Sequence, residues 1–201
     1  MGRREQKKEE NRNVILQSAK TVFIEKGYHN TSISDIIRQT GLARGTFYLY
    51  FQNKKEIFEM LIHKLFTDLM KDMKAIEILN RKHAVSYRED VKDMINSLLK
   101  TVLQHKELVK IFLNSPAGQD TEFDETIERY SGFLIESVKK ILEKGQKKGF
   151  LRDRNATLIS HIIIGGMKEI IFQWLVKDKM ELDETRDVEE IVSFISDGMK
   201  I

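Results

Sequence analysis

The sequence predicts an all-α protein, and three observations support that prediction. One proline and 11 glycines among 201 residues leave few positions at which a helix must end. Apolar residues recur at spacings of three and four along most of the chain, as they do on the buried face of an amphipathic helix. No segment shows the strict alternation of a half-buried strand. We therefore expect about nine helices and no sheet.

The first predicted helix spans residues 9–26. Gly27 follows it and provides a left-handed C-cap, with Tyr28 able to fold back as the hydrophobic contact. The expected buried stripe repeats with the period of a helix and consists of Ile15, Ala19, Val22 and Phe23.

Three short helices are expected next. Ser32 and Asp35 form a capping box that starts the second helix, which ends near Thr40 at Gly41. A glycine-containing turn leads to a third helix over residues 44–50. Two short helices joined by such a turn form a helix-turn-helix. Asn53 then caps a fourth helix, with Glu56 as its reciprocal partner.

The remainder of the chain also has helical periodicity. Ser115-Pro116 is expected to end one helix, because proline biases the preceding residue away from helical geometry. We expect a helix-turn-helix domain over residues 1–55 and a helical body over 56–201. The helices of that body are predicted over residues 54–79, 88–105, 107–114, 122–147, 155–177 and 185–199.

Composition excludes several classes of protein. Hydrophobic residues make up 41 % and charged residues 32 % of the chain, which is typical of a soluble globular protein. The absence of cysteine excludes disulfides, thiolate metal sites and cysteine nucleophiles, and it fits a reducing cytoplasm. The opening MGRREQKKEENRN lacks the apolar stretch of a secretory signal.

The segment 158–176 is the best candidate for a membrane span. It is too polar for a lipid-exposed helix, because it contains His161, Lys168, Glu169 and Gln173. We therefore expect a cytoplasmic protein that has no membrane partner.

Positive charge is concentrated near the N-terminus. Residues 1–55 hold 11 Lys and Arg against 5 Asp and Glu, although the whole chain has a net charge of only +3. A basic segment of this kind favours nucleic acid as a partner. A solvated charged terminus is the alternative, and charge alone does not separate the two.

Four aromatic rings lie within residues 47–51 of the third predicted helix. At 100° per residue, Phe47 and Phe51 share one face with Tyr50 beside them, and that face can fill a small core. Tyr48 shares the other face with Arg44, which offers a guanidinium for a guanine edge.

The run GYHNTSISDIIRQTGLARGTFYLYFQNKKEIF closely resembles the DNA-binding domain of TetR-family transcriptional regulators. The resemblance covers the first four helices and ends near residue 60. It implies that the remaining helices form a ligand-binding and dimerisation domain. The matching positions are Gly27, Tyr28, Thr31, Ser32, Asp35, Ile36, Gly41, Gly45, Thr46, Tyr48, Phe51 and Lys54.

The resemblance also implies which residues contact DNA. Arg44 is the first candidate for base readout, whereas Lys54 and the serines at the start of the second helix would bind phosphate. Leu49 departs from the polar or aromatic residue often found there, which leaves contact with a thymine methyl as one option. Family members vary at Tyr50 between base contact and packing. The implied DNA-binding residues are Ser32, Ser34, Ala43, Arg44, Gly45, Thr46, Tyr48, Leu49 and Lys54.

The basic tail allows two interpretations. Arg3, Arg4, Lys7 and Lys8 either reach the DNA backbone or minor groove, or they form a disordered, solvated tail.

A homodimer is expected from the C-terminal helices. Residues 158–176 are apolar nearly all round, so one face needs cover beyond the chain's own domain. The alternative is an internal helix of a monomeric bundle. The expected interface residues are Ile162, Gly165, Gly166, Ile191 and Ile195.

The resemblance implies a small-molecule effector. Large or polar-tipped side chains on apolar helices are the candidates, although each is also explained as ordinary core. We expect a largely apolar effector that displaces the segment 107–114 and moves the two DNA-binding domains apart. The candidate pocket residues are Met94, Phe112, Phe133, His161, Gln173 and Trp174.

Neither an enzyme nor a cofactor-dependent protein is expected. The five histidines are scattered, and no HExxH, phosphate loop, GxSxG or dinucleotide-binding pattern occurs. A DNA-binding architectural protein or constitutive regulator without a ligand is the remaining alternative. The long helical body argues against it, because DNA binding alone does not require that body.

Overall fold

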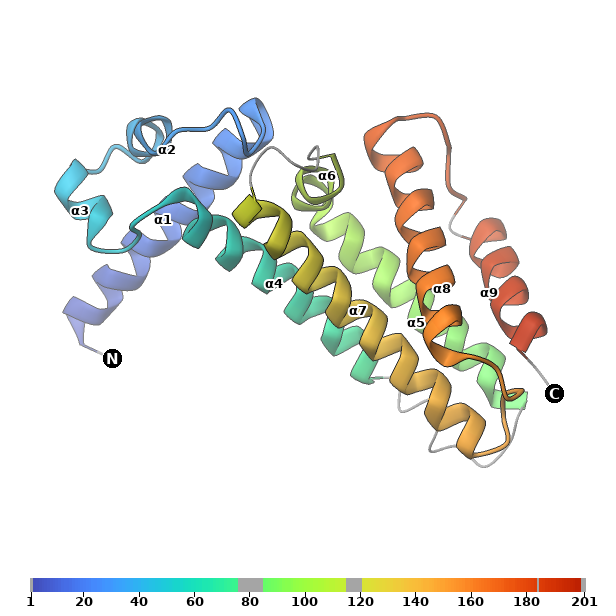
Figure 1. The fold of residues 1–201 in the computed structure, drawn as a ribbon. Coiled ribbons are helices and arrows are strands. Elements are labelled where there is room, and N and C mark those ends of the chain that lie inside the picture. The colour runs from blue at the N-terminus through green and yellow to red at the C-terminus, as the bar shows by residue number, and fades with distance from the viewer. Residues whose placement is uncertain (1, 76–84, 115–120, 184, 200–201) are drawn as a thin grey trace. The chain divides into compact units, whose positions relative to one another are not determined.

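The computed structural model describes residues 2–75, 85–114, 121–183 and 185–199. Its regular elements in these ranges are helices, which confirms the all-α expectation there (Figure 1). In chain order they are α1 (Arg3–Lys26), α2 (Ile33–Thr40), α3 (Arg44–Tyr48), α4 (Lys54–Ala75), α5 (Val85–Gln104), α6 (Lys106–Asn114), α7 (Thr121–Lys147), α8 (Ala156–Ile171), the π-helical η2 (Phe172–Val176) and α9 (Arg186–Met199).

The main difference from the predicted boundaries is at the N-terminus. Helix α1 begins at Arg3 rather than residue 9, so the basic tail is helical and not disordered. Residues 3–10 consist of Arg, Glu, Gln and Lys, all of which have high helix propensity. Gly27 has the expected positive φ of 76°, but its ψ of 160° is not left-handed helical. Residues 76–79 and the Ser115-Pro116 stop lie outside the described residues.

The chain divides into two compact units. Unit 1 comprises Met1–Leu65 and Glu107–Thr126, and unit 2 comprises Phe66–Lys106 and Ile127–Ile201. Unit 1 therefore contains the predicted helix-turn-helix together with most of α6 and the first turn of α7.

The core of unit 1 is rich in aromatic rings. Phe23, Phe47 and Phe58 are fully buried. Phe123, from the first turn of α7, is 1 % exposed, and its ring centroid lies 4.4 Å from that of Tyr28 and 4.8 Å from that of Phe58. The beginning of α7 is thus part of the core beneath α1 and α4.

Unit 2 contains two apolar clusters. One is built around Val138 and Leu142 of α7. The other joins α5 to α9 through five buried side chains, which are Val91, Ile95, Leu99, Val188 and Val192.

Candidate DNA-binding surface

Helix α2 begins with the predicted capping box. The hydroxyl of Ser32 accepts a hydrogen bond from the backbone N–H of Asp35 at 3.1 Å. The Asp35 carboxylate in turn accepts from the Ser32 backbone N–H at 3.1 Å and from the Ser32 hydroxyl at 2.7 Å. These contacts fix the start of α2, and they already use the Ser32 side chain that was expected to bind phosphate.

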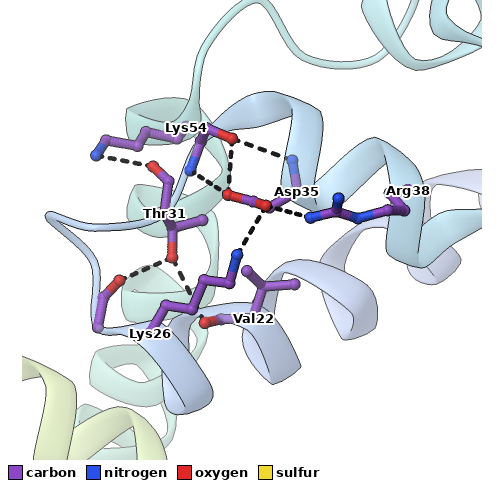
Figure 2. A network of polar contacts seen from close by, with 8 residues as sticks. Val22, Lys26, Thr31, Asp35, Arg38 and Lys54 are labelled. Carbon is purple, nitrogen blue, oxygen red and sulfur yellow. Dashed lines mark hydrogen bonds and ion pairs between the residues drawn. The ribbon is translucent and has the colours of Figure 1, made fainter.

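Asp35 also connects α2 to the last turn of α1. Its carboxylate accepts from Lys26 Nζ at 2.8 Å and pairs with Arg38 one turn later in α2 (Figure 2). The hydrogen bond from Lys26, followed by those from Ser32, holds the pKa of Asp35 well below its usual range. Asp35 is therefore ionised at neutral pH and stabilises the junction of the two helices.

The turn between α2 and α3 is fixed by local hydrogen bonds. Gly41 has a φ of 67° in the left-handed region, which glycine adopts without strain. The Thr40 hydroxyl donates to the Ile37 carbonyl at 2.7 Å and accepts from the Leu42 backbone N–H at 3.0 Å. Helix α3 therefore begins in a defined direction.

Helix α3 separates buried rings from an exposed face, as predicted. Phe47 and Phe51 are 0 % and 2 % exposed. On the opposite side Leu49 is 80 % exposed, and the Arg44 guanidinium lies 5.8 Å from the centroid of the Tyr48 ring. The buried rings thus anchor a short helix whose other face is open.

The exposed face of α3 leaves room for a partner. Arg44 and Gly45 are exposed, and a Cβ placed on Gly45 would meet no atom within 4 Å. The Tyr50 hydroxyl, by contrast, accepts a hydrogen bond from Asn11 Nδ2 of α1 at 3.2 Å. Tyr50 is therefore hydrogen-bonded to α1.

Among the other predicted DNA contacts, Ser34 and Ala43 are exposed, and Thr46 and Tyr48 are half-buried.

Lys54 is engaged within the chain. Its Nζ donates to the backbone carbonyl oxygens of Tyr28 at 2.9 Å, His29 at 3.1 Å and Thr31 at 3.1 Å. The expected phosphate contact of Lys54 stays a prediction.

The first two turns of α1 border α3. Arg3, Arg4, Lys7 and Lys8 line an open groove of about 900 Å³ together with Glu5, Leu49 and Tyr50. All four basic side chains are exposed. With four cations against the single carboxylate of Glu5, this groove is net positive.

Unit 2 carries a second surface, which is apolar. An open groove of about 340 Å³ runs between α8 and α9, which lie side by side in Figure 1. Its lining includes Ile162, Gly166, Ile191 and Ile195 of the predicted interface, and the remaining member, Gly165, is exposed on α8. Sequence reasoning missed Phe194, which is 78 % exposed on α9. Phe194 lies off the buried stripe of α9 and one turn from Ile191, and a large apolar side chain at such a position was the available signal.

Helix α8 and η2 together are long and apolar enough to cross a membrane, with a mean hydropathy of 1.3 over Ala156–Val176. Only 6 % of the most apolar window is buried in the chain. One such helix is weak support for a membrane span, and an uncovered protein interface has the same composition.

The predicted pocket residues are dispersed over the described part of the chain. Phe112 is buried in unit 1, whereas the other five belong to unit 2. Phe133 and His161 are exposed, and Trp174 packs on the cluster between α5 and α9. Gln173 donates to Glu169 at 2.7 Å. Met94 is half-buried on α5.

Across the described residues, no group of three or more His, Asp or Glu side chains could hold a metal ion.

Two family models match the chain. One, described as bacterial regulatory proteins of the tetR family, matches residues 15–61. The other, described as a tetracyclin repressor-like C-terminal domain, matches residues 89–200. Together they include α2, α3 and most of the helical body.

One relative and two solved structures agree with these matches. The chain is 24 % identical to the fatty acid metabolism regulator protein of Bacillus subtilis, over 82 % of this chain and 84 % of that one. A TetR-family regulator from Syntrophomonas wolfei has a similar crystal structure, with 27 % identity, a TM-score of 0.78 and 93 % coverage of both chains. The B. subtilis regulator FadR in complex with stearoyl-CoA shares the fold, with 22 % identity, a TM-score of 0.75, and coverage of 92 % of this chain and 97 % of that one.

Proposed function

The chain belongs to the TetR family of bacterial transcriptional regulators, and from that premise we propose that it is a ligand-responsive repressor that binds a palindromic operator as a homodimer. The exposed face of α3 carries this proposal. Buried Phe47 and Phe51 hold Arg44 and Gly45 on a surface that is open for the major groove.

In this proposal the residues 1–55 bind DNA. Arg44 contacts a guanine edge, and Leu49 makes an apolar contact with a thymine methyl. The hydroxyls of Thr46 and Tyr48 and the start of α2 bind phosphate, which sets the position of α3 in the groove. Arg4 and Lys7 of α1 contact the flanking backbone, because they line the groove beside α3.

The dimer forms through α8 and α9. Their groove is lined by isoleucines and by Phe194, and α8 buries only Ala156 and Ser160 within the chain. A second copy of the same surface covers these apolar side chains and explains the composition of α8. Two copies of α3 about 34 Å apart would reach successive major grooves.

We also propose that this DNA-binding regulator is located in the cytoplasm.

The effector is a largely apolar small molecule that binds within residues 56–201. The similarity to a fatty acid metabolism regulator supports an acyl chain as the apolar part. An effector that binds better to the DNA-free conformation lowers operator affinity, and operator DNA lowers effector affinity by the same factor.

Selection against random duplex DNA at two salt concentrations tests the operator proposal. We expect a two-fold symmetric motif with half-sites about one helical turn apart. Arg44→Ala should lower affinity by ~1–3 kcal/mol per half-site and remove the preference at one base pair of each half-site. Lys64→Ala, which removes a cation from the exposed side of α4, is the control and should bind normally. Strongly salt-dependent binding without any motif would replace this proposal with an architectural role.

Titration with stearoyl-CoA tests the effector. We expect it to raise the melting temperature of the protein and to release the selected operator, whereas free coenzyme A should do neither. A rise in melting temperature with unchanged operator affinity would contradict the proposed coupling. No response to stearoyl-CoA would exclude long-chain acyl thioesters as effectors.

A further inference from the structure

Lys54 lies at the first position of α4, where a cation is unfavourable for the helix dipole. Its ammonium group has three N–H donors, and the three carbonyl oxygens of Tyr28, His29 and Thr31 match them in number. Nζ also lies 4.6 Å from the centroid of the Tyr28 ring. We call this arrangement the Lys54 clamp. It gives the lysine a complete set of partners without any DNA.

The loop that the clamp holds depends on side chains for its shape. The Thr31 hydroxyl donates to the Gly27 carbonyl at 2.7 Å, and Asn30 Nδ2 donates to the Lys26 carbonyl at 3.2 Å. Thr31 itself is 3 % exposed. Five backbone carbonyls between Lys26 and Thr31 thus accept from side chains, and Lys54 donates to three of them.

The loop leads directly into the proposed DNA-binding surface. Thr31 precedes Ser32, the N-cap of α2, and α2 carries the turn into α3. The clamp therefore connects the first residue of α4 to the start of α2. We propose that Lys54 is a positioning residue for operator binding, which fixes the start of α2 through the three carbonyls and does not itself bind phosphate. The functional half of this inference rests on the proposed operator binding.

The chemistry of the clamp separates these two roles. Three converging carbonyls suit the compact ammonium of lysine, whereas the planar guanidinium of arginine points its donors in a fixed fork. A DNA phosphate, by contrast, accepts hydrogen bonds from either lysine or arginine. Lys54→Arg therefore keeps a phosphate ligand but disrupts the clamp, and Lys54→Met removes both.

Operator affinity measured over a series of salt concentrations tests the proposal. We expect Lys54→Met and Lys54→Arg each to weaken binding by about tenfold, with the slope of log affinity against log salt unchanged. A phosphate ligand predicts the opposite result. In that case Lys54→Arg binds normally, and Lys54→Met reduces the slope by about 0.9 for each lysine removed.

Hydrogen exchange in the free protein tests the clamp independently of DNA. We expect faster exchange at the backbone amides of residues 31–36 in both Lys54 variants. Lys64→Met, on the exposed side of the same helix, should leave these amides unchanged. Unaltered exchange in Lys54→Met would overturn the proposal. If the wild-type protein selected no operator, the proposed function would fail while this comparison still decided whether the clamp exists.

Discussion

The two proposed contact surfaces differ in how they are built. The α2–α3 surface exposes polar and cationic side chains, and its geometry is fixed by buried rings and by the Asp35 contacts beneath it. The α8–α9 surface exposes isoleucine and phenylalanine side chains around an open groove. A surface that binds a solvated, charged partner must be held in position by the core of its own chain. An apolar surface is instead stabilised by the partner that covers it.

The largest expected effect comes from a substitution that disrupts the α8–α9 surface. Phe194→Asp places a charge in the apolar groove, so we expect monomers in sedimentation velocity experiments. Operator affinity should fall by about 10²–10⁴-fold, because two linked contacts become one. Phe133→Asp, which changes another exposed phenylalanine of unit 2, is the control. A Phe194→Asp protein that stayed dimeric would show that the subunits meet elsewhere.

The second prediction concerns the support beneath α2–α3. Phe123→Ala should lower the free energy of unfolding by ~3–5 kcal/mol, because it removes a buried ring from the core of unit 1. Phe133→Ala on the same helix should cost far less, since Phe133 is 54 % exposed. Urea unfolding measures both. Equal losses would mean that Phe123 is no more important to packing than an exposed ring.

Gly45 separates the requirements of folding from those of DNA binding. Gly45→Ala should leave the fold intact and stabilise α3 by up to ~1 kcal/mol, because its Cβ meets no atom of the chain. Operator affinity should nevertheless fall by about tenfold, as the new methyl group faces the groove. Gly132→Ala, at an open position of α7, should show the stabilisation alone. Normal operator binding by Gly45→Ala would place the DNA away from this residue.

The smallest effect is a pH dependence that differs between the units. The pKa of Asp35 in unit 1 is lowered by Lys26, and that of Glu189 in unit 2 is lowered to about 2, chiefly by Arg88. A carboxylate whose pKa is depressed in the folded state contributes stability that is fully present above the unfolded pKa of ~4. That contribution is lost as the pH falls from there toward the folded-state pKa. Asp35→Asn should therefore lower the melting temperature at pH 7 and flatten its decline toward pH 3. An unchanged decline would assign the acid sensitivity to other groups, with Glu189→Gln as the next variant.

Local signals in the sequence predicted the helix-turn-helix well. The Ser32–Asp35 capping box, the glycine at position 41 and the division of Phe47 from Arg44 all depend on residues within one or two turns of each other. Such contacts are set by backbone geometry and helical period, so a single sequence is enough to predict them.

Contacts between distant segments were decided only by the tertiary structure. The sequence shows no sign that Phe123 would pack against Tyr28 or that the carbonyls of the α1–α2 loop would surround Lys54, because a carbonyl oxygen belongs to every residue alike. The groove beside Phe194 likewise requires α8 and α9 to lie side by side. The sequence by itself determined that the chain is helical, the capping box that starts α2, and the family. The packing of segments far apart in the chain determined which side chains remain free for a partner, since burial depends on what each helix meets.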